Sequence, residues 1–426
     1  IKMGLLAANT KAIPFCQEGL SALEQVLKKR PDDEILIRAK AQIHALMSDY
    51  VDASATYHLL QQKKMATPND MLQHAISERR LNHKTKVDSL LEDIDDVCAI
   101  ELEKAEQVND MAKKYKINSL QARSRIVGDK LDDAGEILRK MSADIQPESL
   151  HYDTESYFSD TWDRIKRLRE IVAGRDIAIM ALGPSLDEFE ARLEEFKPYG
   201  EKLCFFGTSQ YGISEKNICE PLGTNHPVIF ETSPIYINTI MPQVIPFLER
   251  PEKNLMITVP LAMDNLKYPN IDRAEMEQKY GEKMLYFSME QDCIASPDKP
   301  LCFLPGNSFS TIVPFACIAN PSRIFLFGAD AHVPKKLAET SGYYKGDKEY
   351  VNSVTDELEA YFPNRCEQGM KADCALFNVQ CNDNIEALCA LYKVNRPPIY
   401  NVGLESHLEL FPKISYSECL QKLKEE

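Results

Sequence analysis

Hydrophobic and polar residues follow two different patterns along the chain, and the change comes near residue 150. Residues 1–150 contain few glycines, and their apolar positions predict one helix after another. From about residue 172, short apolar runs alternate with helical segments and are separated by Gly, Pro and Asn. Such runs are typical of strands that are buried on both faces of a sheet. The second pattern therefore predicts a parallel sheet with right-handed helical crossovers.

The predicted architecture is an α/β fold in which a Rossmann-like parallel-sheet domain follows an all-α domain of helical hairpins. We assign residues 1–150 to the helical domain, 151–171 to a connecting helix or linker, and 172–426 to the sheet domain. The strands are predicted at Asp176–Leu182, Leu203–Gly207, Val228–Phe230, Leu255–Val259, Arg323–Gly328 and Ile399–Val402. The helices between them are predicted at Leu186–Phe196, Tyr236–Leu248, Arg273–Tyr280 and Ser310–Asn320.

The helical domain carries segments that resemble tetratricopeptide units. Gly19–Leu27, Met47–Tyr57 and Gly128–Leu138 each contain small residues where paired helices of that repeat approach closely. The spacing between the segments is irregular, and an unrelated helical bundle is the alternative. In either case, we expect this domain to bind a partner: a protein or glycan acceptor, or another subunit.

Composition excludes several classes of function. The chain has 426 residues and a net charge of -15, which argues against a nucleic-acid-binding surface. No apolar stretch is long enough to span a membrane. The 12 cysteines form no CxxC pair and have no histidine at zinc spacing. We therefore expect a cytoplasmic protein with reduced thiols and no metal site.

Polar residues follow the apolar runs at the ends of the predicted strands, where ligands bind in open parallel sheets. Taken one at a time, each group reads as an ordinary strand-to-helix turn or loop cap. Together they predict a ligand site, although neither a GxGxxG sequence nor a P-loop lysine is present. The residues are Gly183, Pro184 and Ser185; Thr208, Ser209 and Gln210; Glu231 and Thr232; Gly306, Asn307 and Ser308; and Asp330 and His332.

The order of these residues resembles a known group. Gly183–Leu186, Thr208–Gln210, Gly306–Ser308 and Ile324–Asp330 occur in the sequence expected for the Maf flagellin glycosyltransferases and the related 6-hydroxymethylpterin diphosphokinase-like domain. They are also similar, more distantly, to the bacterial sialyltransferases that use CMP-sialic acid. The resemblance covers about residues 172–412.

The resemblance implies a glycosyltransferase that moves a nonulosonic acid from a CMP-activated donor to a hydroxyl, with inversion and without a metal or further cofactor. Gly183, Pro184, Ser185, Gly306, Asn307 and Ser308 would then bind the phosphate and sugar of the donor. Thr208, Ser209, Gln210 and Thr232 would lie at the cytidine and ribose.

The resemblance also implies catalytic roles. His332 stands where the sialyltransferases have a tyrosine that hydrogen-bonds the leaving phosphate. Residues 371–378, where those enzymes have the base histidine ahead of their last long helix, contain no histidine. Asp373 or His332 would then act as the base, and Asp330 would hold the ligand.

Two other functions remain open at the sequence level. The first is an ATP-dependent, diphosphokinase-like transfer to a small alcohol, with a divalent ion held by Asp330 and Glu231. The second is a non-catalytic adaptor, which the missing base histidine favours.

Overall fold

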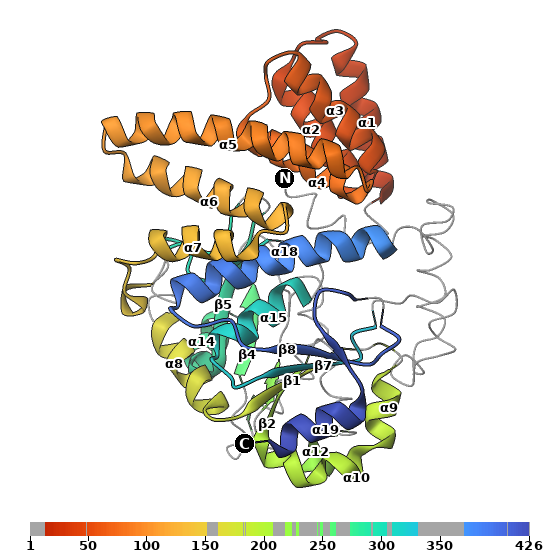
Figure 1. Cartoon of the computed structure of the whole chain (residues 1–426), viewed down its shortest axis with the longest axis vertical. Coiled ribbons are helices and arrows are strands. Elements are labelled where there is room, and N and C mark those ends of the chain that lie inside the picture. The colour runs from red at the N-terminus through yellow and green to blue at the C-terminus, as the bar shows by residue number, and fades with distance from the viewer. Residues whose placement is uncertain are drawn as a thin grey trace. The chain divides into compact units, whose positions relative to one another are not determined.

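The computed structural model describes residues 13–47, 49–150, 161–181, 183, 185–207, 218–223, 227–229, 245, 248–249, 256–260, 273–290, 293–304, 309–330, 370–406 and 408–425. These residues divide into two compact units. The helical unit contains the described residues up to 141 together with 370–379. The sheet unit contains the described residues from 142 to 330 together with 380–425. Figure 1 shows the elements of both.

The helical unit is a series of helices in which each helix packs against the next one along the chain. Asp33, Asp49 and Asp110 begin three of the helices by accepting a backbone N–H with their side chains. The helices are α1 (Ile13–Leu27), α2 (Glu34–Leu46), α3 (Tyr50–Gln62), α4 (Pro68–Arg80), α5 (Lys84–Gln107), α6 (Met111–Val127) and α7 (Leu131–Met141).

Small residues allow close helix packing at two of the three predicted segments. Ala53 in α3 and Ala134 in α7 are completely buried. Tyr57, one turn after Ala53, is also buried, and it packs into a cluster with Ile37 of α2. Ala22 in α1, by contrast, is exposed. The predicted run of helices is confirmed, and the small-residue packing occurs at the second and third segments.

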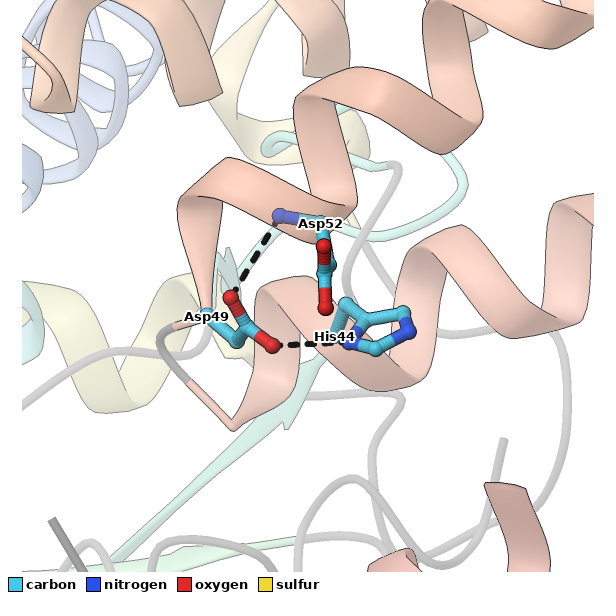
Figure 2. A group of neighbouring side chains, drawn as sticks. All are labelled: His44, Asp49 and Asp52. Atoms are coloured by element: carbon cyan, nitrogen blue, oxygen red, sulfur yellow. Dashed lines mark hydrogen bonds and ion pairs between the residues drawn. The ribbon is translucent and has the colours of Figure 1, made fainter. Parts of the chain in front are cut away.

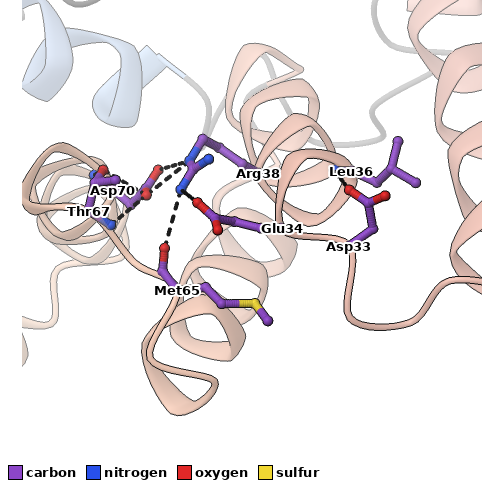
Figure 3. Close-up of polar contacts among 7 residues, drawn as sticks. All are labelled: Asp33, Glu34, Leu36, Arg38, Met65, Thr67 and Asp70. Atoms are coloured by element: carbon purple, nitrogen blue, oxygen red, sulfur yellow. Dashed lines mark hydrogen bonds and ion pairs between the residues drawn. The ribbon is translucent and has the colours of Figure 1, made fainter.

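A buried ion pair joins α2 to the start of α4 (Figure 3). Arg38 Nε lies 2.9 Å and 3.0 Å from the two carboxylate oxygens of Asp70, whose side chain is almost completely buried. Asp70 also closes the capping box of α4, because its Oδ2 accepts the backbone N–H of Thr67 at 2.8 Å. The Arg38 guanidinium also donates hydrogen bonds to the Glu34 carboxylate and to the Met65 carbonyl. One arginine therefore fixes the turn between α3 and α4 against α2.

The strands of the described residues form one nine-stranded sheet in the order β6-β5-β4-β3-β2-β1-β7-β8-β9, and every neighbouring pair is parallel. The strands are β1 (Asp176–Met180), β2 (Leu203–Gly207), β3 (Pro227–Ile229), β4 (Met256–Pro260), β5 (Met284–Met289), β6 (Cys302–Phe303), β7 (Ile324–Phe327), β8 (Ile399–Val402) and β9 (Lys413–Ile414).

Helices cover both faces of this sheet. Side chains of successive strand residues point to opposite faces. Phe205 of β2 packs in one core with Phe189 of α9 and Cys419 of α19, whereas the ring of Phe206 lies 6.2 Å from that of Phe315 in α15. The helices of the sheet unit are α8 (Thr161–Val172), α9 (Leu186–Ala191), α10 (Leu193–Phe196), α12 (Glu220–Leu222), α14 (Arg273–Tyr280), α15 (Phe309–Ile318), the end of α18 (Met370–Leu391) and α19 (Tyr416–Lys424).

The mixed α/β class with a parallel sheet is confirmed. All the predicted strands occur within two residues of their predicted ends, and β2 and β8 have the predicted ends. The predicted helix at 186–196 is split into α9 and α10, and the one at 310–320 is α15. The predicted helix at 236–248 lies largely outside the described residues. The sequence prediction missed β5, β6 and β9.

Candidate functional site

The strand order creates a switch point between β1 and β7. After β1 the chain continues to β2 on one side, and after β7 it continues to β8 on the other. The connections that leave the carboxyl ends of β1 and β7 therefore diverge, and ligands of open parallel sheets bind at such a point. The residues after β1 include Gly183 and Ser185, and those after β7 include Asp330.

Hydrogen bonds join the two strand ends directly. The backbone N–H of Ser185 donates to Asp330 Oδ2 at 2.7 Å. The N–H of Gly183 donates to the carbonyl of Gly328 at 2.9 Å, and that of Ala181 donates to Phe327 at 2.8 Å. The structure thus brings together Gly183, Ser185 and Asp330, which the sequence had singled out from segments far apart in the chain.

Two glycines make this close approach possible. A Cβ atom at Gly183 would lie 2.4 Å from both Asp330 Oδ2 and the Gly328 carbonyl oxygen. Gly328 has a φ of +68° and lies close to Ala181. A Cβ atom at Gly328 would lie 2.7 Å from the Ala181 carbonyl oxygen. Only glycine satisfies both the steric demand at 183 and the left-handed conformation at 328.

Among the described residues, only one carboxylate oxygen of Asp330 has a donor. Its side chain is 9% exposed, and no described residue donates to Oδ1. The Ser185 hydroxyl beside it is buried and has no hydrogen-bond partner among the described residues. The third strand end, at Gly403 after β8, is close to both: its Cβ position lies 3.6 Å from Ser185 Oγ and 4.0 Å from Asp330 Oδ1. The site thus offers an acceptor and a hydroxyl side by side.

Residues that the sequence prediction did not single out hold this arrangement in place. Ser406 Oγ donates to the Ala329 carbonyl at 2.7 Å, and Asn401 donates to Ser406 Oγ at 2.8 Å. The Tyr416 hydroxyl donates to the Ser185 carbonyl at 2.7 Å. Burial, reinforced by neighbouring carboxylates, raises the pKa of Tyr416, so the hydroxyl remains protonated as a donor. Only Asn401 had a sequence signal, as a polar residue inside a predicted strand.

The local geometry differs from the prediction in one respect. A loop cap at Ser185 would give α9 a side-chain cap hydrogen bond, and the phosphate role that the resemblance implies would need free N–H groups in this turn. Ser185 makes no side-chain cap hydrogen bond, and its N–H is occupied by the Asp330 carboxylate. A carboxylate repels a phosphate at the same place. The turn is therefore better suited to a neutral hydroxyl group than to an anion.

The remaining predicted site residues cannot be placed from the described residues. Pro184, Thr208, Ser209, Gln210, Thr232, Gly306, Asn307, Ser308, His332 and also Glu231 lie outside them. Asp373 lies in α18, in the part that belongs to the helical unit, and its side chain is outside the described residues. Residues 371–378 are the first turns of α18 and not, as predicted, a segment ahead of the last long helix.

Both flanks of residues 305–308 are anchored by one side chain. Asn384 in α18 accepts the backbone N–H of Leu304 with Oδ1 at 2.9 Å and donates to the Ser310 carbonyl with Nδ2 at 2.8 Å. Asn384 is completely buried, and α15 begins at Phe309. The predicted donor-binding residues 306–308 thus connect two fixed ends, and a helix follows them as expected.

One group outside this site combines residue types that bind metals. In the helical unit, ligand atoms of His44, Asp49 and Asp52 all lie within 4.8 Å of one another (Figure 2). His44 Nδ1 is 3.0 Å from Asp49 Oδ2, and Asp49 Oδ1 accepts the Asp52 N–H as the cap of α3. A helix cap and a histidine in the last turn of α2 account for these contacts.

Comparison with models of known protein families finds no match to this chain, and comparisons with curated proteins and with solved structures find none either. Among the helices in the described ranges, none is both long and apolar enough to span a lipid bilayer.

Proposed function

We propose that the sheet unit is a Rossmann-like glycosyltransferase domain that binds a nucleotide-activated sugar at the carboxyl ends of β1, β7 and β8. The donor is a CMP-activated nonulosonic acid, and the acceptor is a hydroxyl group of a protein or glycan. The reaction proceeds with inversion and uses the nucleotide sugar without a further cofactor. The protein acts in the cytoplasm.

The observation that supports this proposal best is the meeting of Ser185 and Asp330 at the switch point of the sheet. Residues 145 positions apart converge there, and a buried carboxylate keeps an oxygen free of described donors. A buried carboxylate is costly for a fold unless donors reach both of its oxygens. A ligand hydroxyl that donates to Asp330 Oδ1 would remove that cost.

We assign each part of the donor to one part of the site. The Asp330 carboxylate accepts a hydrogen bond from a hydroxyl of the sugar, and the hydrogen bond from the Ser185 N–H orients this carboxylate. Residues 306–308, which precede the N-terminus of α15, receive the phosphate. Thr208, Ser209, Gln210 and Thr232 face the cytidine. His332 donates to the departing phosphate, and His332 or Asp373 removes the proton of the acceptor.

The helical unit is proposed to be tetratricopeptide-like and to bind the acceptor or another subunit. Large apolar side chains are exposed on it within the described residues, and a partner could contact them there. They are Val26, Ile35, Val51, Leu59, Ile100, Val108 and Met111.

Calorimetric titration of the full chain tests the donor. We expect CMP to bind in the presence of EDTA, because no metal is required. Binding of ATP with magnesium, together with no heat from CMP, would instead support the diphosphokinase-like reaction.

The variant Asp330→Asn tests the site within the same assay. The asparagine oxygen can still accept the Ser185 N–H, but the negative charge is lost. We expect CMP-sugar affinity and transfer to fall at least about tenfold, the effect of losing one charge-assisted hydrogen bond. An adaptor would keep its partner interactions and its cellular phenotype in this variant.

Asp176→Asn is the matched control. Asp176 is also buried in β1, but it lies at the amino end of the strand and pairs with Arg323 at 2.8 Å. This variant should lose stability and keep its affinity for CMP. Equal losses of affinity in both variants would contradict a site at the carboxyl ends of the strands.

A further inference from the structure

A tight hairpin at the edge of the sheet brings two cysteines together. Ser296 and Lys299 exchange backbone hydrogen bonds of 3.1 Å and 2.9 Å. The same antiparallel register, continued outward from this bridge, sets Cys293 opposite Cys302. The contacts agree: the Cys302 thiol donates to the Cys293 carbonyl oxygen at 3.5 Å, so the two cysteines are direct neighbours, and the Cys293 thiol donates to the Ile294 carbonyl at 3.3 Å.

The two thiols have different surroundings. Cys293 is half-buried, whereas Cys302 is completely buried at the start of the edge strand β6. The neighbouring Cys302 thiol and the positive charge of Lys299 lower the pKa of Cys293, and they outweigh the effect of its burial and of nearby carboxylates. The neighbouring Cys293 thiol and burial raise the pKa of Cys302. Cys293 is therefore the more accessible of the two thiols and the one that ionises more readily.

We propose that Cys293 and Cys302 form a redox-active dithiol that hydrogen peroxide converts to an intramolecular disulfide. The Cys293 thiolate attacks one peroxide oxygen, the O–O bond breaks, and hydroxide leaves as water, which produces a sulfenic acid. The Cys302 sulfur then attacks the Cys293 sulfur, gives up its proton and releases a second water. Two thiols lose two electrons in total, and one peroxide is reduced to two waters. A small thiol reverses the reaction by exchange.

A second pair of cysteines in the sheet unit provides an internal control. Cys317 in α15 and Cys389 in α18 are also neighbours, but both are buried. Burial and the neighbouring Cys389 thiol raise the pKa of Cys317. Thiol contact is thus common to both pairs, whereas access to solvent and a neighbouring lysine belong to Cys293.

Peptide mass spectrometry of the full chain tests the proposal. Reduced protein is treated with hydrogen peroxide, alkylated with iodoacetamide under denaturing conditions, and cleaved with endoproteinase Asp-N. This protease cuts before Asp292 and Asp298 and so separates Cys293 from Cys302. We expect a disulfide-linked pair of peptides at peroxide concentrations that leave Cys389 fully alkylated. We also expect Cys293 of the native protein to react with iodoacetamide at least about tenfold faster than Cys317.

Two variants separate the roles of the thiols. In Cys302→Ser, Cys293 should accumulate as a sulfenic acid that dimedone labels, and the link should be absent. In Cys293→Ser, Cys302 should remain reduced. Alkylation of both cysteines in peroxide-treated wild-type protein would overturn the proposal, and so would oxidation of the Cys317–Cys389 pair first. These results do not depend on transferase activity, so they are distinguishable from a failure of the proposed function.

Discussion

Replacing Gly183 with alanine should disrupt the junction between β1 and β7. The new Cβ would lie 2.4 Å from Asp330 Oδ2 and from the Gly328 carbonyl oxygen, so the turn must move away from both. That movement breaks the 2.7 Å hydrogen bond from the Ser185 N–H to the carboxylate, which is worth about 1.5–3 kcal/mol. Crowding adds about 1–3 kcal/mol. We therefore expect a loss of about 2.5–6 kcal/mol in the free energy of unfolding of the sheet unit.

Trp162 makes this measurement specific to the sheet unit. It is the single tryptophan of the chain, and its ring stacks on Tyr392 with the centroids 6.4 Å apart. Both residues belong to the sheet unit. Urea unfolding followed by tryptophan fluorescence therefore reports on this unit, while far-ultraviolet circular dichroism follows the whole chain.

Gly174→Ala is the control substitution. Gly174 has a φ of +70°, but its Cβ position meets no atom within 4 Å. This variant should lose only about 1–2 kcal/mol, the cost of a left-handed alanine. If Gly183→Ala were no less stable than Gly174→Ala, the close approach of Gly183 to Asp330 would be refuted. CMP-sugar affinity should fall in Gly183→Ala and remain unchanged in Gly174→Ala.

Three further substitutions test the contacts that hold each unit. Asp70→Ala removes the capping box of α4 and the partner of Arg38. The free energy of unfolding of the helical unit, followed by circular dichroism, should fall by about 2–4 kcal/mol. The unfolding transition seen by tryptophan fluorescence should not change. Burial opposes the charge of Glu78, but hydrogen bonds from Ser54, His83 and Lys86 prevail and lower its pKa to about 2. Because this pKa is depressed, the stabilisation from ionised Glu78 should be complete above about pH 4.5 and should vanish as the pH falls through about 2. The free energies of unfolding of wild type and Glu78→Gln should therefore become equal in acid. A difference that stays constant with pH would contradict this. Tyr416→Phe should lower the free energy of unfolding of the sheet unit by about 1–3 kcal/mol, measured by tryptophan fluorescence, because the half-buried Ser185 carbonyl loses its donor. An unchanged transition would show that this hydrogen bond contributes nothing.

The sequence predicted the inner strands well because they are apolar on both faces. Ile177–Met180 of β1 and Ile324–Phe327 of β7 are completely or almost completely buried. Residues on both faces of these strands are therefore apolar, and each strand appears in the sequence as a continuous apolar run. The edge strands β6 and β9 are two residues long each, and so short a segment has no periodicity to detect. In β5, the polar Ser288 interrupts the apolar run, and the Tyr286 hydroxyl pairs with Glu277, so the strand lacked the continuous pattern of the others.

The candidate site was predictable only in part. Gly183, Ser185 and Asp330 follow apolar runs, and that position alone marks strand ends in a parallel sheet. Their contact depends on β1 and β7 being neighbours, which local sequence patterns do not encode. The roles of Ser406 and Tyr416 depend on the same strand order, because each bonds a backbone carbonyl on a different strand connection. The occupation of the Ser185 N–H by Asp330 could not be foreseen for the same reason.

The amide of Asn384 has a consequence for how this domain can diversify. Because one buried side chain bonds both Leu304 and Ser310, the separation of those two positions is set independently of the residues between them. If residues 306–308 bind the donor, as proposed, substitutions among residues 305–308 would alter ligand preference without disturbing the assembly of the sheet. Selection for new substrates and selection for foldability would act on different parts of the same short stretch.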